Sequence, residues 1–395
     1  MKVLFAILLL FFIASPSLVK INAANDLCFN VFQYGAKGDG VADDSNAFLK
    51  AWQDVCAAED TPTLFIPDGS TFMLQPVSFS GPCKSATVNV VLEGTLLAPG
   101  SVENWDWTTS RNTEAWIQFR HINGLVVYGG GTIDGQGAPW WIKYGKNDQD
   151  RPRALQFSGC DNLQLAGLTH VNSPKNHISI DSCNGVAVSD LYITAPESSP
   201  NTDGIDIASS SNVFIDRLKI ATGDDCIAIN SGSKFINISD ISCGPGHGIS
   251  IGSLGKHGEF GSVEEIYVKR CTFQGTTNGV RIKTCPGGTG YAKKITYEDI
   301  NIVGGYNPVI IDQAYEGSID DLKRESLKVS DVTLRNIRGT TNDKESITLN
   351  CASVGCTNIV LEDININSVN GESSASCINV QGTCNSCNPT VSCLN

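Results

Sequence analysis

The chain has 395 residues, of which 41% are hydrophobic and 17% charged, and its net charge at pH 7 is −13. This acidic balance argues against nucleic acid as a partner, and an anionic ligand would need a locally basic site. The length allows either one large domain or two ordinary ones.

The first residues have the pattern of a secretory signal peptide. Met1-Lys2 precedes the apolar run VLFAILLLFFIA, and small residues follow up to Ala23-Ala24. The run is too short to span a bilayer, and Pro16 stands where a membrane anchor, the alternative, would continue. We therefore expect residues 1–23 to be removed and the protein to be secreted, with no membrane partner.

Fifteen cysteines fit an oxidising compartment. Only Cys384 and Cys387 form a C-x-x-C, without the second motif or paired histidines of a zinc site, so disulfides are the better interpretation and no metal is expected. An odd count leaves at least one thiol free or bonded to a partner. We expect bridges between Cys226 and Cys243, between Cys351 and Cys356, and among Cys377, Cys384, Cys387 and Cys393. One glycosylation sequon, Asn237-Ile238-Ser239, is compatible with secretion.

One clear helix is predicted near the N-terminus, in the segment DDSNAFLKAWQDVC. Asp43, Asp44 or Ser45 can cap it. Its apolar stripe consists of Ala47, Phe48, Ala51, Trp52 and Val55. A solenoid needs its open end covered, and this helix would do that.

Beyond about residue 89 the chain repeats one unit of two or three short β-branched runs. The first runs begin at intervals of 23, 27, 22, 22, 31, 29 and 38 residues, at Leu155, Ile178, Ile205, Ile227, Ile249, Val280, Val309 and Ile347. Units of this length without long helices predict a parallel β-solenoid with stacked inward aliphatic residues; propeller blades would be longer. No linker divides the chain, so we expect one domain over 24–395.

Three titratable residues occupy equivalent positions on successive units. Asp203, Asp225 and His247 each stand two residues before an inward isoleucine, at equal intervals of 22 residues. Equivalent positions on adjacent coils stack about 4.8 Å apart, so these groups should form a ladder, with Asp224 beside it. One unit later, Arg281 and Lys283 alternate with inward residues and should point outward.

The ladder faces water only if the chain bends before each strand, which the neighbouring glycines permit. Taken singly, Gly-Asp-Asp is ordinary turn chemistry, His247 is a common structural residue, and the two cations are a solvated strand face. Their shared register favours a functional site. Two carboxyl groups are what glycosidic hydrolysis requires, crowding keeps one of them protonated, and the cations would bind an anionic sugar.

At these residues the chain resembles the plant polygalacturonases of glycoside hydrolase family 28. The motifs that carry the resemblance span nearly the whole mature chain: FNVFQYGAKGDGVADDSNAF, GGGTIDGQGAPWW, SPNTDGIDI, TGDDCIAI, CGPGHGISIGSLG, NGVRIKT and NPVIIDQAY. The resemblance implies an all-β, right-handed parallel β-helix and inverting hydrolysis of α-1,4-galacturonosyl bonds in demethylated pectin. The expected partner is therefore an anionic cell-wall polysaccharide, and we expect a monomer without a cofactor.

The resemblance also implies residue roles. Asp224 would be the general acid, Asp203 and Asp225 would position and deprotonate water, and His247 would support the acid. Substrate binding would fall to Arg281, Lys283, Asn201 and Tyr315. The chain departs from the family at Cys285, where tryptophan is usual, and at Glu316, where cysteine is usual, which puts a local disulfide and one subsite in doubt.

Two other functions stay open from the sequence. A uronate lyase on the same fold would need calcium-binding carboxylates and a strong base, and a non-catalytic pectin-binding wall protein would need only the binding residues. Internal and chain-end cleavage are also both open, because they depend on whether loops near Tyr144 or Lys256 close one end of the groove.

Overall fold

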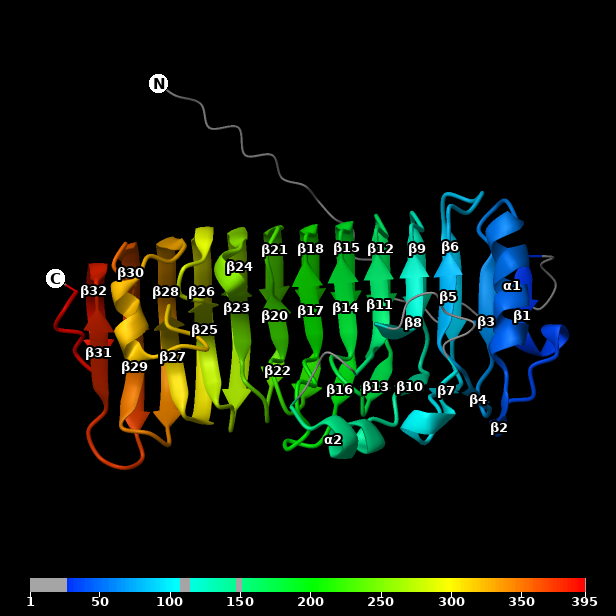
Figure 1. Cartoon of the computed structure of the whole chain (residues 1–395), viewed down its shortest axis with the longest axis horizontal. Helices are drawn as coiled ribbons and strands as arrows, with labels where there is room; N and C mark the ends of the chain where they lie inside the picture. The colour runs from blue at the N-terminus through cyan, green and yellow to red at the C-terminus, as the bar shows by residue number, and fades with distance from the viewer. Residues whose placement is uncertain (1–26, 107–113, 147–150, 395) are drawn as a thin grey trace, which may run out of the picture.

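The computed structural model describes residues 27–106, 114–146 and 151–394, and the expected signal peptide, residues 1–23, lies outside them. The described chain winds into coils of short parallel strands that stack along one long axis (Figure 1). The strands form two sheets, one with 11 strands and one with 21. The predicted parallel β-helix is confirmed.

The smaller sheet receives one strand from each successive coil. Its strands, in chain order, are β5 (Val77–Ser80), β8 (Ala115–Arg120), β11 (Arg153–Ser158), β14 (Ile178–Asp181), β17 (Ile205–Ala208), β20 (Ile227–Ile229), β23 (Ile249–Leu254), β25 (Asn278–Thr284), β27 (Asn307–Asp312), β29 (Glu345–Asn350) and β31 (Ser374–Ile378).

The larger sheet receives two short strands from each early coil and one long strand from each late coil. Both β21 and β22 pair with the single strand β24, where this change occurs. The strands are β1 (Cys28–Asn30), β2 (Asp39–Asp43), β3 (Thr63–Ile66), β4 (Thr71–Met73), β6 (Val88–Leu92), β7 (Thr95–Leu97), β9 (Leu125–Tyr128), β10 (Thr132–Asp134), β12 (Leu163–Ala166), β13 (Thr169–Val171), β15 (Asn184–Ser189), β16 (Tyr192–Thr194), β18 (Ser211–Asp216), β19 (Lys219–Ala221), β21 (Ser233–Ser239), β22 (Ser242–Cys243), β24 (Phe260–Gln274), β26 (Thr289–Gly305), β28 (Lys328–Thr341), β30 (Cys356–Ser368) and β32 (Val380–Asn388).

The inward aliphatic column has the register that the repeat predicts. Each member pairs with the next across the smaller sheet, and all are at most 2% exposed: Leu155, Ile178, Ile205, Ile227, Ile249, Val280, Val309 and Ile347. Register is fixed this strongly because a slip by one residue would turn every buried side chain outward. The same register sets the order of the outward residues.

Helix α1 (Ser45–Ala57) covers the N-terminal end of the stack, as predicted (Figure 1). Its buried stripe contains all five predicted apolar residues, and Trp52 packs against Phe79 and Phe119 with ring centroids 5.4 and 5.8 Å apart. Asp44 is the N-cap residue, but its carboxylate accepts hydrogen bonds from the Lys37 and Gly38 amides instead of capping the helix. A disulfide that the sequence did not predict, Cys56–Cys83, anchors the helix end.

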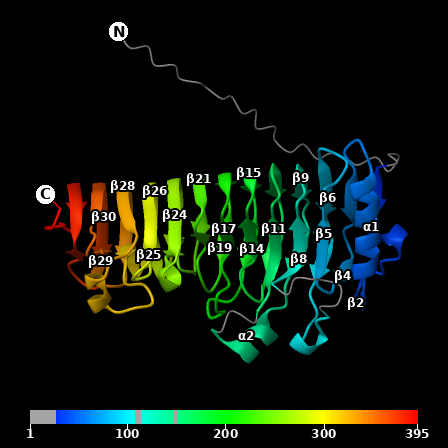
Figure 2. The same cartoon turned by 45° about the horizontal axis from the view of Figure 1, so that its top comes forward.

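A second short helix, α2 (Ala138–Tyr144), projects from the side of the stack (Figure 2) and was not predicted. The described residues also contain four short 3₁₀ helices: η1 (Val31–Tyr34), η2 (Val102–Asn104), η3 (Lys256–Gly258) and η4 (Ile319–Lys323). None of the helices in the described residues combines the length and apolar character needed to cross a membrane.

The predicted disulfides Cys226–Cys243 and Cys351–Cys356 are present. The four C-terminal cysteines also pair among themselves, as Cys377–Cys393 and Cys384–Cys387. The remaining thiols are free: Cys28, Cys160, Cys183, Cys271 and Cys285. The odd count is therefore explained by five free thiols, four of which are buried.

Candidate active site

The three segments of the predicted ladder bend immediately before their strands. The bends include Gly204 before β17, Gly223 before β20 and Gly246 before β23. Gly248 adopts φ +82°, in the left-handed region that favours glycine, and a Cβ there would collide with the Gly279 carbonyl oxygen. The predicted ladder requires such bends before the strands, but Asp225, one of its members, is fully buried.

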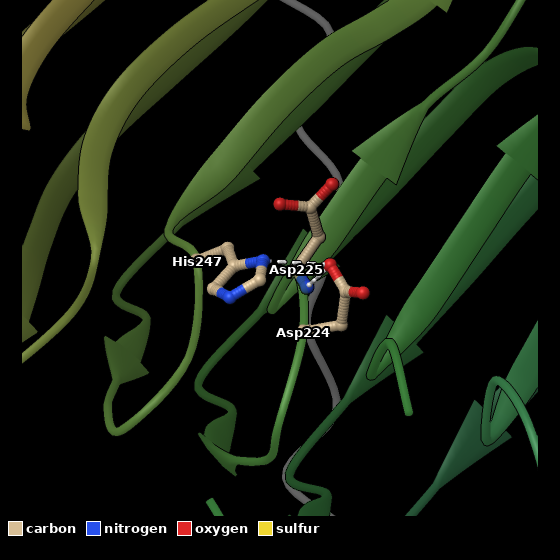
Figure 3. Close-up of side chains that lie close together, drawn as sticks. All are labelled: Asp224, Asp225 and His247. Carbon is tan, nitrogen blue, oxygen red and sulfur yellow. Dashed lines mark hydrogen bonds and ion pairs between the residues drawn. The ribbon is translucent and has the colours of Figure 1, made fainter. Parts of the chain in front are cut away.

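Asp224 and His247 form the open part of the site (Figure 3). The Asp224 Oδ1 lies 2.8 Å from the His247 Nδ1, and their side chains are 20% and 34% exposed. Asp224 Oδ1 also accepts a hydrogen bond from the Asp225 amide at 2.9 Å. Although equal spacing aligned His247 with Asp225, the imidazole contacts the first aspartate of the doublet.

Asp225 points away from that pair and is fully buried (Figure 3). Its Oδ1 accepts hydrogen bonds from Ser250 Oγ at 2.9 Å and from an Arg281 Nη2. Its Oδ2 accepts one from Lys283 Nζ at 2.7 Å. The sequence predicted that these cations point outward, and their side chains are only 10% and 9% exposed. They extend outward from β25 and cover the carboxylate.

The cations decide the ionisation of Asp225. Burial alone would raise the pKa of its carboxyl, but Arg281 and Lys283, with hydrogen bonds from Lys283 and Ser250, outweigh burial and lower that pKa. Burial likewise opposes charge on both cations, yet Asp225 raises the pKa of each. The buried carboxylate of Asp225 stays ionised because two cations and a hydroxyl group donate hydrogen bonds to it.

Asp203 has the opposite electrostatic environment. Burial, followed by the carboxylates of Asp224, Asp206 and Asp225, raises the pKa of Asp203 well above its ordinary value. The backbone carbonyl of Asp203 accepts a hydrogen bond from the His177 amide at 2.8 Å and lies 3.1 Å from His177 Nδ1. This contact, together with its complete burial, gives His177 a structural role.

Asp206 lies on the outer face of β17, next to this cluster. Burial raises the pKa of Asp206 to about 6, against the effect of Arg153, and Asp225 adds to the rise. Asn176 Nδ2 donates to Asp206 Oδ2 at 2.7 Å. The other oxygens of both side chains are buried without a hydrogen-bond partner in the described part of the chain.

Asn201 and Tyr315, the other two predicted binding residues, have different partners. Asn201 Oδ1 accepts a hydrogen bond from Arg151 Nη2 at 2.6 Å, and Arg151 Nη1 donates to the Pro174 and Pro200 carbonyls. The buried Arg151 was missed in the sequence, since nothing in the repeat links it to Asn201, 50 residues away. Tyr315 lies under Lys283, whose Nζ is 5.2 Å from the ring centroid.

The two departures from the family pattern lie beyond Lys283. Cys285 is a buried free thiol, and Glu316 forms an ion pair with Lys256 at 3.1 Å. Both side chains of the pair are about half exposed, at 49% and 48%. Glu316, one of the departures noted from the resemblance, thus holds one end of a surface ion pair.

One cluster has the composition of a metal site. Ligand atoms of Asp224, Asp225 and His247 lie within 4.8 Å of one another. However, both oxygens of Asp225 already accept hydrogen bonds from cations, and those positive charges oppose a divalent ion. The residues do not fit a metal, and their chemistry is that of acids and bases.

A parallel β-helix that presents crowded carboxyl groups, an imidazole and two cations on the outer face of one sheet defines a glycoside hydrolase for an anionic polysaccharide. Comparison with protein families agrees. The family model of Glycosyl hydrolases family 28 matches residues 56–390, and the chain belongs to this family. The resemblance inferred from the motifs is confirmed.

Individual relatives support this membership. The chain is 49% identical over 374 residues to the probable polygalacturonase At3g15720 of Arabidopsis thaliana, covering 92% of this chain and 80% of that protein. It is 40% identical over 364 residues to a polygalacturonase of Persea americana, covering 90% and 77%.

Solved structures also match. Endo-xylogalacturonan hydrolase from Aspergillus tubingensis superposes with a TM-score of 0.80 at 28% identity, covering 89% of this chain and 96% of that one. Polygalacturonase from Erwinia carotovora ssp. carotovora superposes with a TM-score of 0.69 at 26% identity, covering 86% and 93%.

Proposed function

We propose that the protein is a polygalacturonase that hydrolyses α-1,4-galacturonosyl bonds of demethylated pectin with inversion. Membership of family 28 supports the reaction class. The observation that carries the substrate class is the contact of Arg281 and Lys283 with Asp225, because it places two cations at the acid cluster of a chain with net charge −13. A galacturonate carboxylate needs such a local basic site.

Asp224 is the proposed general acid. It is the doublet carboxyl that remains accessible, and the hydrogen bond between its Oδ1 and His247 fixes its orientation beside the imidazole. Burial, followed by the carboxylates of Asp224, Asp206 and Asp225, raises the pKa of Asp203, so the crowded cluster favours a protonated carboxyl group. As the general acid, Asp224 would deliver a proton to the glycosidic oxygen as the bond breaks.

Asp225 and Asp203 are the proposed bases for water. In the free protein Arg281 and Lys283 lower the pKa of Asp225, which makes it a weak base. A bound galacturonate carboxylate would also interact with these two cations, and it would weaken their lowering of the pKa of Asp225. The base therefore strengthens when substrate is present, which ties water activation to binding of an anionic sugar.

Secretion to the cell wall is part of the proposal. The disulfides between described residues suit an oxidising compartment. The partner there is galacturonan, bound by one copy of the chain along the outer face of the smaller sheet. A signal peptide over residues 1–23 and one catalytic domain over 24–395 complete this proposal.

The test is the Asp224→Asn variant, assayed for release of reducing ends from polygalacturonate and for binding to it. The proposal predicts loss of release by about 1000-fold or more with binding retained. The matched control is Asp240→Asn, which removes an aspartate that pairs with Arg270 on the other sheet. Activity of Asp224→Asn equal to that of the control would refute the acid role.

A further inference from the structure

The only N-x-S/T sequon of the chain lies in strand β21, in the larger sheet and away from the catalytic segments. Ile236 and Ile238 are buried at 0% and 1% exposed, so the alternating strand turns Asn237 outward between them. The strand label in Figure 1 places this segment in the middle of the stack. Asn237 is therefore partly exposed within a strand and does not lie in a loop.

Aromatic residues flank Asn237 on both neighbouring coils. Asn237 pairs in register with Phe214 of β18 on one side and with Tyr267 of β24 on the other. Phe214 is 51% exposed, and Phe235, two residues before Asn237, is 45% exposed. Large apolar side chains gathered on an exposed sheet face generally mark a contact surface.

Asn237 also separates two open hollows of this face. One, of about 540 Å³, is lined by Phe235, Asn237 and Tyr267 with Thr296 and Thr333. The other, of about 330 Å³, is lined by Phe214, Asn237 and Tyr267 with Asp216 and Lys269. Each hollow thus combines aromatic rings with hydroxyl or charged groups, which is the composition that carbohydrate, with apolar ring faces and hydroxyl edges, can contact.

We propose that Asn237 carries an N-linked glycan whose first sugars lie over Phe214 and Tyr267 and cover these hollows. The inference rests on the proposed secretion, because the modification requires passage through the secretory lumen. It concerns a surface distinct from the galacturonan site, since β21 belongs to the larger sheet and the catalytic segments lead into the smaller one.

The glycan comes from a lipid-linked oligosaccharide diphosphate. A bond forms between C1 of the first sugar and Asn237 Nδ2, the bond from C1 to the diphosphate oxygen breaks, and the amide proton leaves with the lipid diphosphate. In the folded strand Ser239 Oγ donates to Asp216 Oδ1 at 3.0 Å, so the sequon hydroxyl is already engaged. Transfer therefore precedes pairing of β21 with β18.

The first test is mass spectrometry of the full chain secreted from plant cells behind a host secretory leader. Its mass should exceed the sequence mass by one glycan, and both Asn237→Gln and Ser239→Ala should remove this excess. Formation of the Cys226–Cys243 disulfide marks passage through the oxidising compartment. Secreted, disulfide-bonded protein with unmodified Asn237 would overturn the proposed glycosylation, and it would leave the proposed polygalacturonase activity unaffected.

The second test asks where the glycan lies. Loss of the glycan in Asn237→Gln should lower the Tm in the natural background and in Tyr192→Ala, but much less in Phe214→Ala. Tyr192 is the matched control because it is 47% exposed on the same sheet and pairs with Lys219, not with Asn237. Equal losses of Tm in all three backgrounds would show that the glycan does not contact Phe214 and would overturn that part of the proposal. The kcat/KM of Asn237→Gln should equal that of the unsubstituted protein.

Discussion

Asp224 and His247 are joined twice, although they stand on different coils. Their side chains meet with Oδ1 and Nδ1 2.8 Å apart, and the His247 amide donates to the Asp224 carbonyl oxygen, also at 2.8 Å. The backbone bond holds the imidazole beside the carboxyl. The proposed acid is therefore oriented by the stacking of the coils themselves.

Replacing His247 with glutamine should lower kcat by about 100-fold with little change in KM, because the imidazole orients Asp224 and does not cover the cations. The effect should be smaller than that of Asp224→Asn. Steady-state kinetics on polygalacturonate measure both constants. A rise in KM with kcat unchanged would instead assign His247 to substrate binding.

Asp225→Asn should destabilise the protein as well as inactivate it. The change leaves Arg281 and Lys283 buried without their carboxylate, at a cost of about 3 kcal/mol in the free energy of unfolding. Denaturant unfolding measures this loss. The exposed pair of Asp240 and Arg270 is the control, and Asp240→Asn should change stability little. Equal stability of the two variants would contradict the buried ion cluster.

The free energy of unfolding should fall as the pH rises through the pKa of Asp206. Burial raises the pKa of Asp206 to about 6, so between pH 4 and 6 the folded state binds more protons at this group than the unfolded state does. Stability is then highest below the unfolded pKa and is lost toward pH 6. Denaturant unfolding at a series of pH values should show this loss in the natural protein, and Asp206→Asn should reduce it, with the part due to Asp203 remaining. An unchanged slope in the variant would contradict the assignment.

The Lys256–Glu316 ion pair should affect how strongly the protein prefers a negatively charged substrate over a methyl-esterified one. Glu316→Gln removes one surface carboxylate and releases Lys256 from its ion pair, so KM for demethylated galacturonan should fall about threefold at low salt. The difference in KM between Glu316→Gln and the natural protein should be smaller at high salt and with methyl-esterified pectin. Glu265→Gln, which breaks the Lys294 pair on the other sheet, is the control. A KM that rises in Glu316→Gln would refute this prediction.

The sequence predicted the parts of the fold that repeat. Inward isoleucines such as Ile205 and Ile227 mark one position per coil, and parallel pairing transmits that register along the chain, so the smaller sheet could be derived from intervals alone. Helix α1 followed from its apolar stripe. The Cys56–Cys83 bridge and helix α2 lie in segments between repeating strands, where no periodic signal fixes the path.

The sequence predicted where the site lies in the fold, but it did not predict which side chains contact one another. Equal intervals bring Asp225 and His247 to adjacent coils, yet the bend before each strand pairs the imidazole with Asp224. Arg281 stands 56 residues after Asp225 and reaches it across an intervening coil, over Ser250. Side chains of this length can point to water or fold over a neighbour, and a single sequence does not distinguish these outcomes.

The most direct test of the central claim is proton NMR of polygalacturonate during its first minutes of cleavage. Inverting hydrolysis of an α bond predicts that newly formed reducing ends appear as the β anomer and only later equilibrate, without ultraviolet-absorbing unsaturated products. Initial release of the α anomer, or of unsaturated ends, would contradict the account.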